Sequence, residues 1–365
     1  MAKNYDFSEL KELININSYT KNKEGVDKNG ALMREKLEAL GFECEVFERK
    51  EIGNHLYFKS KKREGAKILL LGHLDTVFPP MSFEEFREDE EWIYGPGVCD
   101  MKGGNFVALE ALRNLKKEGE IYNIDFLLVS DEETGSDDSK EITAKIAKNY
   151  DYCMVFEAAG KNDELVIERK GVATFYIDIK GKAAHAGNDY EKGVNANLEA
   201  AEKLIAITEL TDLEKGTTAN VGKMEGGIGA NTISPHAKLT VEIRYSSESE
   251  RDRVLKEFYD IVHTSSVPGA SASLSGGIQR DVMQSTPEQK EFIKLIEKLT
   301  GEKVLTEKRG GVSDANIVAS VKTVVVDGFG PYGDGDHTIH ERASKKSFIK
   351  RIDFVTKILK GLTEF

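Results

Sequence analysis

Apolar residues recur along the first 160 positions in two alternating patterns, one typical of strands and the other of helices. Continuous apolar runs, as expected for strands covered on both faces, lie at 66–71, 126–129 and 154–156. Apolar residues at helical spacing precede and separate them, at 5–19, 25–41, 103–117 and 137–149. We therefore predict an α/β domain with a mixed, mostly parallel sheet, whose ligands bind beyond the carboxyl ends of the strands.

The pattern changes near residue 168. Strands in which apolar and polar residues alternate are predicted at 174–179, 217–224, 238–245 and 270–276. Amphipathic helices are predicted at 191–209 and 249–264. The order strand, helix, strand, strand, helix, strand is the ferredoxin-like α+β arrangement. The α/β pattern then resumes, with a helix at 286–299, a strand at 323–326 and a helix at 344–361. We predict one domain from residues 1–168 and 281–365, interrupted by a smaller domain at 169–280.

Composition and charge exclude several classes of protein. The 365 residues carry 51 Lys+Arg and 63 Asp+Glu, and this net charge of −12 gives no electrostatic basis for unspecific binding to nucleic acid or to an anionic membrane. No stretch approaches the roughly 20 apolar residues of a membrane span, and the N-terminus lacks the apolar run of a signal peptide. Three scattered cysteines suit a reducing compartment. We therefore expect a cytoplasmic protein.

Polar side chains follow the first predicted buried strand. His73 and Asp75 lie two residues apart and so point to the same side of an extended backbone. A carboxylate in this position can hold the second ring nitrogen of a histidine that binds a metal ion. The alternative is a strand-end histidine whose hydrogen bonds are satisfied by the neighbouring aspartate.

A glycine-rich loop at 95–104 contains Asp100 just before a predicted helix. Neither the Walker spacing nor the Gly-x-Gly-x-x-Gly pattern is met, which argues against phosphate binding. A carboxylate held in a rigid loop is better suited to bridging cations. Alternatively, Asp100 is the N-cap of the helix.

Further carboxylates and two histidines complete a candidate metal site. Residues 131–133 are Asp-Glu-Glu after the second buried strand, Glu157 ends the third, and His337 and His340 precede the final helix. The side chains of Glu132 and Glu133 diverge, so one can bind a metal ion while the other acts as a base. A solvated acidic turn is the alternative. Two nitrogen and three or more oxygen ligands suit a pair of zinc-like ions that share one carboxylate.

These motifs resemble the co-catalytic zinc metallopeptidase family, which includes glutamate carboxypeptidase, acetylornithine deacetylase, succinyl-diaminopimelate desuccinylase, aminoacylases and tripeptidases. The likeness runs in order over nearly the whole chain. It is closest to bacterial glutamate carboxypeptidase through the loop at 95–104, Glu157 and the segment Gly181–Gly187. The resemblance implies a zinc-peptidase-like catalytic domain, and an inserted dimerisation and lid domain that makes the protein a homodimer.

The resemblance also implies a role for each candidate metal ligand. His73 and Glu157 would hold one Zn²⁺, Glu133 and His337 the other, and Asp100 would bridge both. Co²⁺ or Mn²⁺ are possible substitutes for zinc. The family usually has Asp or Asn where this chain has His340, and the spacing to Glu341 favours His337 over His340 as the ligand.

The remaining matched positions concern catalysis and substrate. Asp75 would orient His73, and Glu132 would be the general base. In the insert, His185, Asn231 and Arg244 match positions that meet the substrate carboxylate or the developing oxyanion, with His185 near the partner subunit's active site. Gly311 matches a backbone contact to substrate.

The implied reaction is hydrolysis of an amide bond next to a free carboxylate, in a small peptide or an N-acyl amino acid. Zinc would lower the pKa of a water molecule, and Glu132 would move its proton to the leaving amine. An N-acyl amino acid deacylase would use the same residues with a different acyl pocket. A catalytically silent peptide-binding relative is the remaining alternative, and the complete set of metal residues argues against it.

Overall fold

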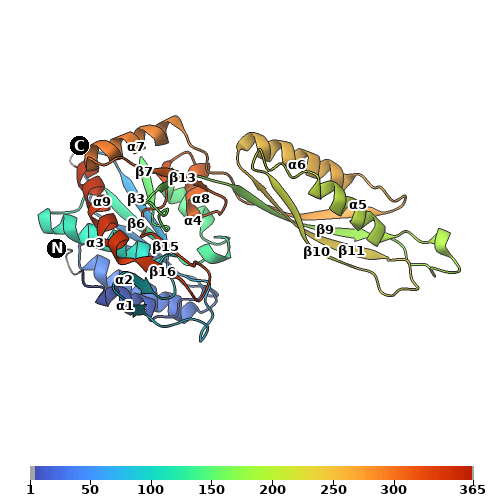
Figure 1. Ribbon diagram of the computed structural model, residues 1–365, viewed down its shortest axis with the longest axis horizontal. Helices are drawn as coiled ribbons and strands as arrows, with labels where there is room; N and C mark the ends of the chain where they lie inside the picture. Colours follow the sequence, from blue (N-terminus) through green and yellow to red (C-terminus); the bar gives the residue numbers. More distant parts are fainter. Residues whose placement is uncertain (1–4, 364–365) are drawn as a thin grey trace. The chain divides into compact units, whose positions relative to one another are not determined.

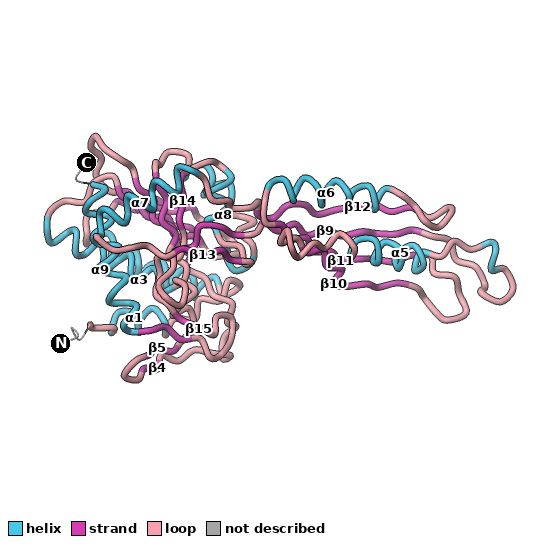
Figure 2. Tube along the Cα trace, turned by 45° about the horizontal axis from the view of Figure 1, so that its top comes forward, coloured by secondary structure: helices cyan, strands magenta, loops and turns pink. Residues whose placement is uncertain are grey.

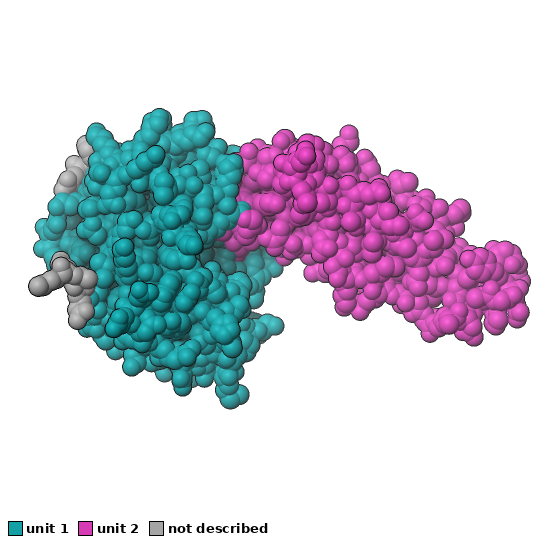
Figure 3. Space-filling model, viewed as in Figure 1, with its two compact units in different colours: residues 1–168, 285–309, 313–365 teal, residues 169–284, 310–312 magenta. Residues whose placement is uncertain are grey.

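The computed structural model describes residues 5–363, and the chain divides into two compact units (Figure 3). The first contains residues 1–168, 285–309 and 313–365, and the second contains residues 169–284 and 310–312. Each unit has its own hydrophobic core. Within residues 5–363, every helix is too short or too polar to span a bilayer.

A six-stranded mixed sheet forms the centre of the first unit. Its order is β1-β2-β6-β3-β7-β14. The strands are β1 (Glu43–Phe47), β2 (His55–Lys59), β3 (Ile68–His73), β6 (Ile124–Val129), β7 (Tyr152–Val155) and β14 (Val324–Val326). The pairs β6–β3, β3–β7 and β7–β14 are parallel, whereas β1 and β2 form an antiparallel edge. The predicted mixed, mostly parallel sheet is confirmed.

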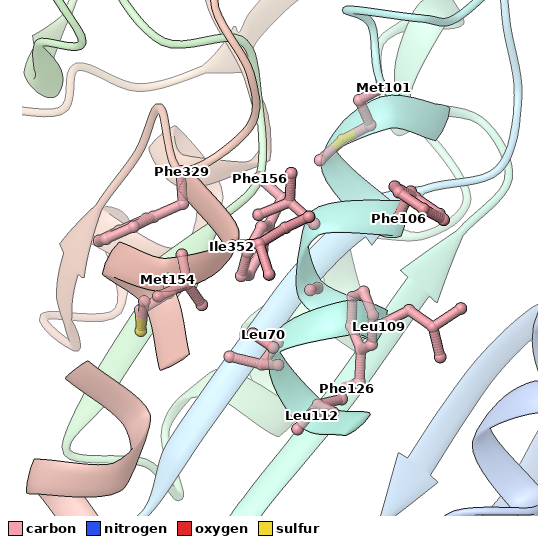
Figure 4. Close-up of a cluster of buried hydrophobic side chains, with 14 of the residues drawn as sticks. Leu70, Met101, Phe106, Leu109, Leu112, Phe126, Met154, Phe156, Phe329 and Ile352 are labelled. Carbon is pink, nitrogen blue, oxygen red and sulfur yellow. The ribbon is translucent and has the colours of Figure 1, made fainter. Parts of the chain in front are cut away.

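Helices cover both faces of this sheet, with α3 and α9 on one side and α4 and α8 on the other (Figure 1). The helices are α1 (Ser8–Ile14), α2 (Lys23–Glu38), α3 (Lys102–Glu118), α4 (Lys140–Ala147), α7 (Pro287–Thr300), α8 (Asp314–Ser320) and α9 (Lys345–Thr363). Phe106 of α3 and Ile352 of α9 belong to the same buried cluster as Leu70 of β3 and Met154 of β7 (Figure 4). This packing fixes the start of α3 beside the ends of the parallel strands.

Short strands join distant segments of the first unit. A four-stranded sheet has the order β15-β16-β5-β4, and a two-stranded sheet pairs β13 with β8. Their bounds are β4 (Arg87–Glu88), β5 (Trp92–Tyr94), β15 (Gly333–Asp334), β16 (Arg342–Ser344), β8 (Leu165–Arg169) and β13 (Thr306–Arg309). The pairing of β16 with β5 attaches the segment that follows His337 to the segment that precedes Asp100.

The second unit is an antiparallel four-stranded sheet with two helices on one face (Figure 2). The elements are β9 (Gly171–Lys180), α5 (Ala196–Thr208), β10 (Thr218–Gly226), β11 (His236–Tyr245), α6 (Glu248–His263) and β12 (Ser271–Arg280), and the sheet order is β10-β11-β9-β12. Alternate residues of β9 and β11 are buried against the helices, as Phe175 is against Phe258 at 4.6 Å between ring centroids. The predicted ferredoxin-like fold is confirmed.

Candidate metal centre

Three acidic residues surround the ring of His73, the last residue of β3. Its Nδ1 lies 3.0 Å from the carbonyl oxygen of Asp75 and 3.4 Å from the Asp75 carboxylate. Its Nε2 lies 3.0 Å from Asp100 Oδ1 and 3.7 Å from Glu157 Oε1. His73 therefore faces the carboxylates of Asp100 and Glu157 as well as that of Asp75. A strand-end histidine that only hydrogen-bonds to its neighbouring aspartate would not need these two further carboxylates.

Asp100 lies between two histidines. One carboxylate oxygen is 3.0 Å from His73 Nε2, and the other is 3.2 Å from His337 Nε2. Helix α3 has Met101 as its N-cap residue and makes no side-chain capping bond there, so the alternative in which Asp100 caps this helix is wrong. A carboxylate with each oxygen facing a different histidine can bridge two cations.

The acidic turn at 131–133 is buried. Glu132 and Glu133 begin a short 3₁₀ helix, η1 (Glu132–Thr134), and Asp131 and Glu132 are among the buried polar residues. Glu133 Oε2 lies 3.2 Å from His337 Nε2, while the Asp131 carboxylate accepts the N–H groups of Asp138 and Ser139. The alternative of a solvated acidic turn is therefore wrong.

The close packing of these carboxylates and histidines shifts their pKa values. Burial and the nearby charge of Asp100 raise the pKa of both Glu133 and Glu157 well above its ordinary value. Hydrogen bonds with Asp100 and Glu133 raise the pKa of His337 to about 11. Burial opposes ionisation of Asp100, but hydrogen bonds with His337 and His73 hold its pKa well below its usual range. Ionisation of all these carboxylates together is therefore unfavourable unless a cation offsets their repulsion.

The donor set fits metal ions. One ligand atom each from His73, Asp100 and Glu133 lies within 4.8 Å of the others. The second oxygen of Glu133 is buried and has no hydrogen-bond partner within residues 5–363. Imidazole nitrogens and carboxylate oxygens are ligands that zinc accepts. The contacts to Asp100 and Glu133 come from His337, the histidine that the spacing to Glu341 favours.

Asp75 is fully buried and connects two segments of the cluster. Its carboxylate, besides facing His73, accepts the hydroxyl of Thr20 at 2.7 Å and the backbone N–H groups of Glu132 and Glu133, both at 3.3 Å. Sequence reasoning expected the contact with His73. It missed the hydrogen bond from Thr20 and the hydrogen bonds from the backbone at 132–133, because no local sequence pattern connects these segments with Asp75.

The four candidate substrate residues all lie in the second unit, at two different places. The segments of His185 and Asn231 pair, with a bridge from His185 to Thr232 and a hydrogen bond from the Ala186 N–H to the Asn231 carbonyl at 2.9 Å. Arg244 is near the other end of β11, where its guanidinium contacts Glu242 at 2.8 Å and the Gly310 carbonyl at 3.1 Å.

The remaining candidate, Gly311, lies beside Arg244. Its carbonyl accepts a hydrogen bond from Arg169 at 3.0 Å, which together with the Arg244–Gly310 contact explains why residues 310–312 belong to the second unit. Along β11, Arg244 lies eight positions beyond His236, which is about 27 Å. The structure therefore brings His185 and Asn231 together, and separates them from Arg244 and Gly311.

Comparison with known proteins gives consistent matches. The model of peptidase family M20/M25/M40 matches residues 69–361. Carboxypeptidase G2 from Pseudomonas sp. (strain RS-16) is 31% identical over 90% of this chain and 82% of its own length. Acetylornithine deacetylase from Proteus mirabilis is 28% identical over 74% of each chain.

Solved structures share the fold. A tripeptidase from Staphylococcus aureus covers 98% of both chains with a TM-score of 0.84 at 24% identity, and aminopeptidase PepT from Bacillus cereus covers 97% of both with a TM-score of 0.78 at 25% identity. The family model spans most of the chain and includes the candidate metal ligands. The resemblance inferred from the motifs is thus confirmed: the chain belongs to peptidase family M20/M25/M40 and is a metal-dependent hydrolase.

Proposed function

We propose that this protein is a carboxypeptidase-like amidohydrolase that cleaves an amide bond next to a free carboxylate. The observation that carries the proposal is the Asp100 carboxylate, which faces His73 with one oxygen and His337 with the other. The buried Glu132 beside the candidate ligand Glu133 supplies a base. The 31% identity with carboxypeptidase G2 favours a substrate with a terminal carboxylate.

His73 and Glu157 would hold one Zn²⁺, His337 and Glu133 a second, and Asp100 would bind both. Bound there, the metal ions would polarise a carbonyl group and lower the pKa of water toward 7. Asp75 orients the ring of His73 through Nδ1, so that Nε2 points at Asp100 and Glu157.

Glu132 acts as the general base in this proposal. It is adjacent to Glu133 in η1, and its backbone N–H is held by Asp75. Because successive side chains diverge, Glu132 can accept a proton from the attacking water without binding the metal. It then delivers the proton to the nitrogen of the leaving amine.

Arg244 provides a clamp for the substrate carboxylate. Its guanidinium is held by Glu242 through Nε and Nη2 and by the Gly310 carbonyl through Nη1. A guanidinium fixed in this way can still offer its outer N–H groups to a carboxylate. The backbone of Gly311, in the same loop, would contact the substrate.

The protein would act as a homodimer through the second unit. The segments of His185 and Asn231 lie at the His236 end of β11, and Arg244 lies about 27 Å along the strand from that end. One second unit therefore cannot supply both places to one small substrate. In a two-fold dimer, one active site could take Arg244 from one chain and His185 and Asn231 from the other. His185 would then hydrogen-bond to the developing oxyanion.

A deacylase of N-acyl amino acids is the second candidate, favoured by the 28% identity with acetylornithine deacetylase. A panel of substrates separates the two. We expect zinc-loaded protein to hydrolyse N-acyl and N-aminoacyl glutamates faster than N-acetylornithine or N-succinyl-diaminopimelate, with two zinc ions per chain by elemental analysis. The reverse order of kcat/KM would favour the deacylase. Metal-loaded protein that cleaves none of them would support the silent relative.

A further inference from the structure

Glu341 is a buried carboxylate that holds the loop before α3. Its side chain is fully buried. Oε2 accepts the N–H of Gly97 at 2.9 Å, and Oε1 accepts the N–H groups of Cys99 and Asp100 at 2.8 and 3.1 Å. Buried backbone N–H groups need partners, and this loop lies outside regular secondary structure. One side chain thus accepts hydrogen bonds from three backbone N–H groups of the loop that contains Asp100.

Glu341 comes from the segment that contains His337, more than 230 residues away in sequence from Asp100. Next to it, β16 pairs with β5, the carbonyl of Glu341 accepts the N–H of Gly95 at 3.3 Å, and the thiol of Cys99 donates to the carbonyl of Arg342 at 2.9 Å. The two segments therefore meet along a continuous line of contacts. At the end of that line, Asp100 Oδ2 and His337 Nε2 are 3.2 Å apart.

The same geometry argues against a metal site at Glu341 itself. Glu341, Cys99 and Asp336 offer three possible ligand atoms within 4.8 Å. However, both Glu341 oxygens accept N–H groups, and the buried thiol of Cys99 is directed at a carbonyl. Glu341 is thus placed to hold the backbone.

We propose that Glu341 is a positioning residue that sets the separation between Asp100 and His337, and hence the fit of the metal pair. The proposal rests on the proposed function, in which both residues bind metal. A carboxylate can accept all three N–H groups at once. A glutamine amide would turn its own N–H₂ toward at least one of them, and alanine would leave all three without their partner.

Zinc affinity of Glu341→Gln and Glu341→Ala, measured by competition with a chromophoric chelator, tests this role. Replacing residues that orient metal ligands typically lowers metal affinity 10- to 100-fold. We expect about tenfold weaker Zn²⁺ binding for the glutamine variant and about 100-fold for the alanine variant, with an altered visible spectrum of bound Co²⁺. The spectrum reports ligand geometry, which a loss of stability alone would leave unchanged.

Glu199→Gln is the matched control. Glu199 is also fully buried and accepts two backbone N–H groups, those of Ser266 and Val267 at 2.9 and 2.7 Å, but it belongs to the second unit. We expect this variant to melt at a lower temperature and to bind Zn²⁺ as the wild type does. Wild-type Zn²⁺ affinity and Co²⁺ spectrum in both Glu341 variants would overturn the proposal.

Hydrogen exchange of the wild type tests the proposal without a variant. In metal-free protein we expect the amides of Cys99 and Asp100 to exchange slowly, because Glu341 holds them before any metal binds. Exchange at the rate of an unprotected chain would overturn the proposal. Failure of the proposed function is seen separately, as wild-type protein that binds no zinc.

Discussion

At the scale of single residues, Asp75 joins two segments that contribute metal-ligand candidates. It faces His73 on one side and accepts the N–H groups of Glu132 and Glu133 on the other. An aspartate that only oriented a histidine would act on one ligand. Asp75 is placed to position two candidate ligands, His73 and Glu133, together with the proposed base, Glu132.

We therefore expect Asp75→Asn to lower both zinc affinity and kcat by about 10- to 100-fold, because an amide cannot accept hydrogen bonds on both sides. Thr20→Val, which removes one hydroxyl donor to the same carboxylate, should have a smaller effect of the same kind. Titration with Zn²⁺ and steady-state kinetics measure the two quantities. Wild-type zinc affinity in Asp75→Asn would contradict this role.

Lys102 is a buried basic residue beside the candidate site. Its ammonium donates to the carbonyls of Leu13 and Ile16 at 2.9 and 2.6 Å, and burial lowers its pKa to about 7. The unfolded chain holds this proton up to about pH 10.5, whereas the folded chain releases it near pH 7. Between these values the unfolded state binds more protons, so the free energy of unfolding rises with pH.

We expect this contribution to reach at most about 1.4 kcal/mol per pH unit between pH 7 and 10, and to be absent below pH 7. Lys102→Met removes the titrating group, so its unfolding free energy should rise less steeply over that range. Urea unfolding of the metal-free protein and the variant at pH 7, 8 and 9 measures the slope. Equal slopes in the two proteins would show that Lys102 keeps its proton.

The candidate metal ligands were easier to predict from the sequence than the residues that hold them in place. His73, Glu157 and the turn at 131–133 follow apolar strands, and the carboxyl ends of parallel strands meet at one edge of a sheet. Thr20 and Glu341 act through contacts with residues more than 50 positions away. A single sequence contains no signal for such contacts beyond the spacing of Glu341 from His337.

At the scale of elements, the sequence predicts best where burial is complete. Strands β3 and β6 are buried throughout and β7 is buried in all but its first residue, and these strands were predicted. The edge strand β1 has a mixed burial pattern and was missed. The helix expected at 5–19 ends at Ile14. Residues 18–20 instead pair with Thr76, through N–H···O contacts of 2.9 and 3.2 Å, and this places Thr20 beside Asp75.

The two glycines at the start of α3 allow the helix to approach its neighbours closely. A Cβ on Gly104 would lie 1.8 Å from the carbonyl oxygen of Phe156, the residue before Glu157, and one on Gly103 would lie 2.0 Å from the carbonyl of Val98. The structure shows that the backbone approaches the strand end that leads to Glu157.

Gly104→Ala should therefore lower the free energy of unfolding by about 1–3 kcal/mol, because the helix must move away from the end of β7. Gly277→Ala is the control, since a Cβ there would meet open space and should change stability by less than about 0.5 kcal/mol. Urea unfolding of both variants gives the comparison. Equal stability of the two would mean that α3 tolerates the methyl group.

At the scale of the whole molecule, the positions of His185 and Arg244 in the second unit bear on assembly. Both were predicted to contact substrate. The segment of His185 lies at the His236 end of β11, and Arg244 lies about 27 Å along the strand from that end. Sequence order alone could not reveal this separation, because it follows from the register of β11 against β9. The proposed dimer with shared active sites would account for this separation.

Mixing two inactive variants tests the shared sites. Glu132→Gln and His185→Ala should each be nearly inactive as pure dimers, and subunit exchange should create one intact site in each mixed dimer. An equimolar mixture should then regain about a quarter of wild-type activity, as random pairing in a two-fold dimer predicts. Activity of the mixture equal to the mean of the two pure variants would contradict shared sites.

In the proposed reaction the cluster around Asp100 hydrolyses an amide with Glu132 as the base, and the ratio of kcat between Glu132→Gln and wild type measures the contribution of that base. Both proteins are loaded with zinc and assayed on the same N-acyl glutamate, with Glu141→Gln on the exposed side of α4 as the control. General-base catalysis predicts a loss of roughly 10² or more in Glu132→Gln, unchanged zinc content and a wild-type rate for the control. Turnover by Glu132→Gln within about tenfold of wild type would show that Glu132 is not the general base.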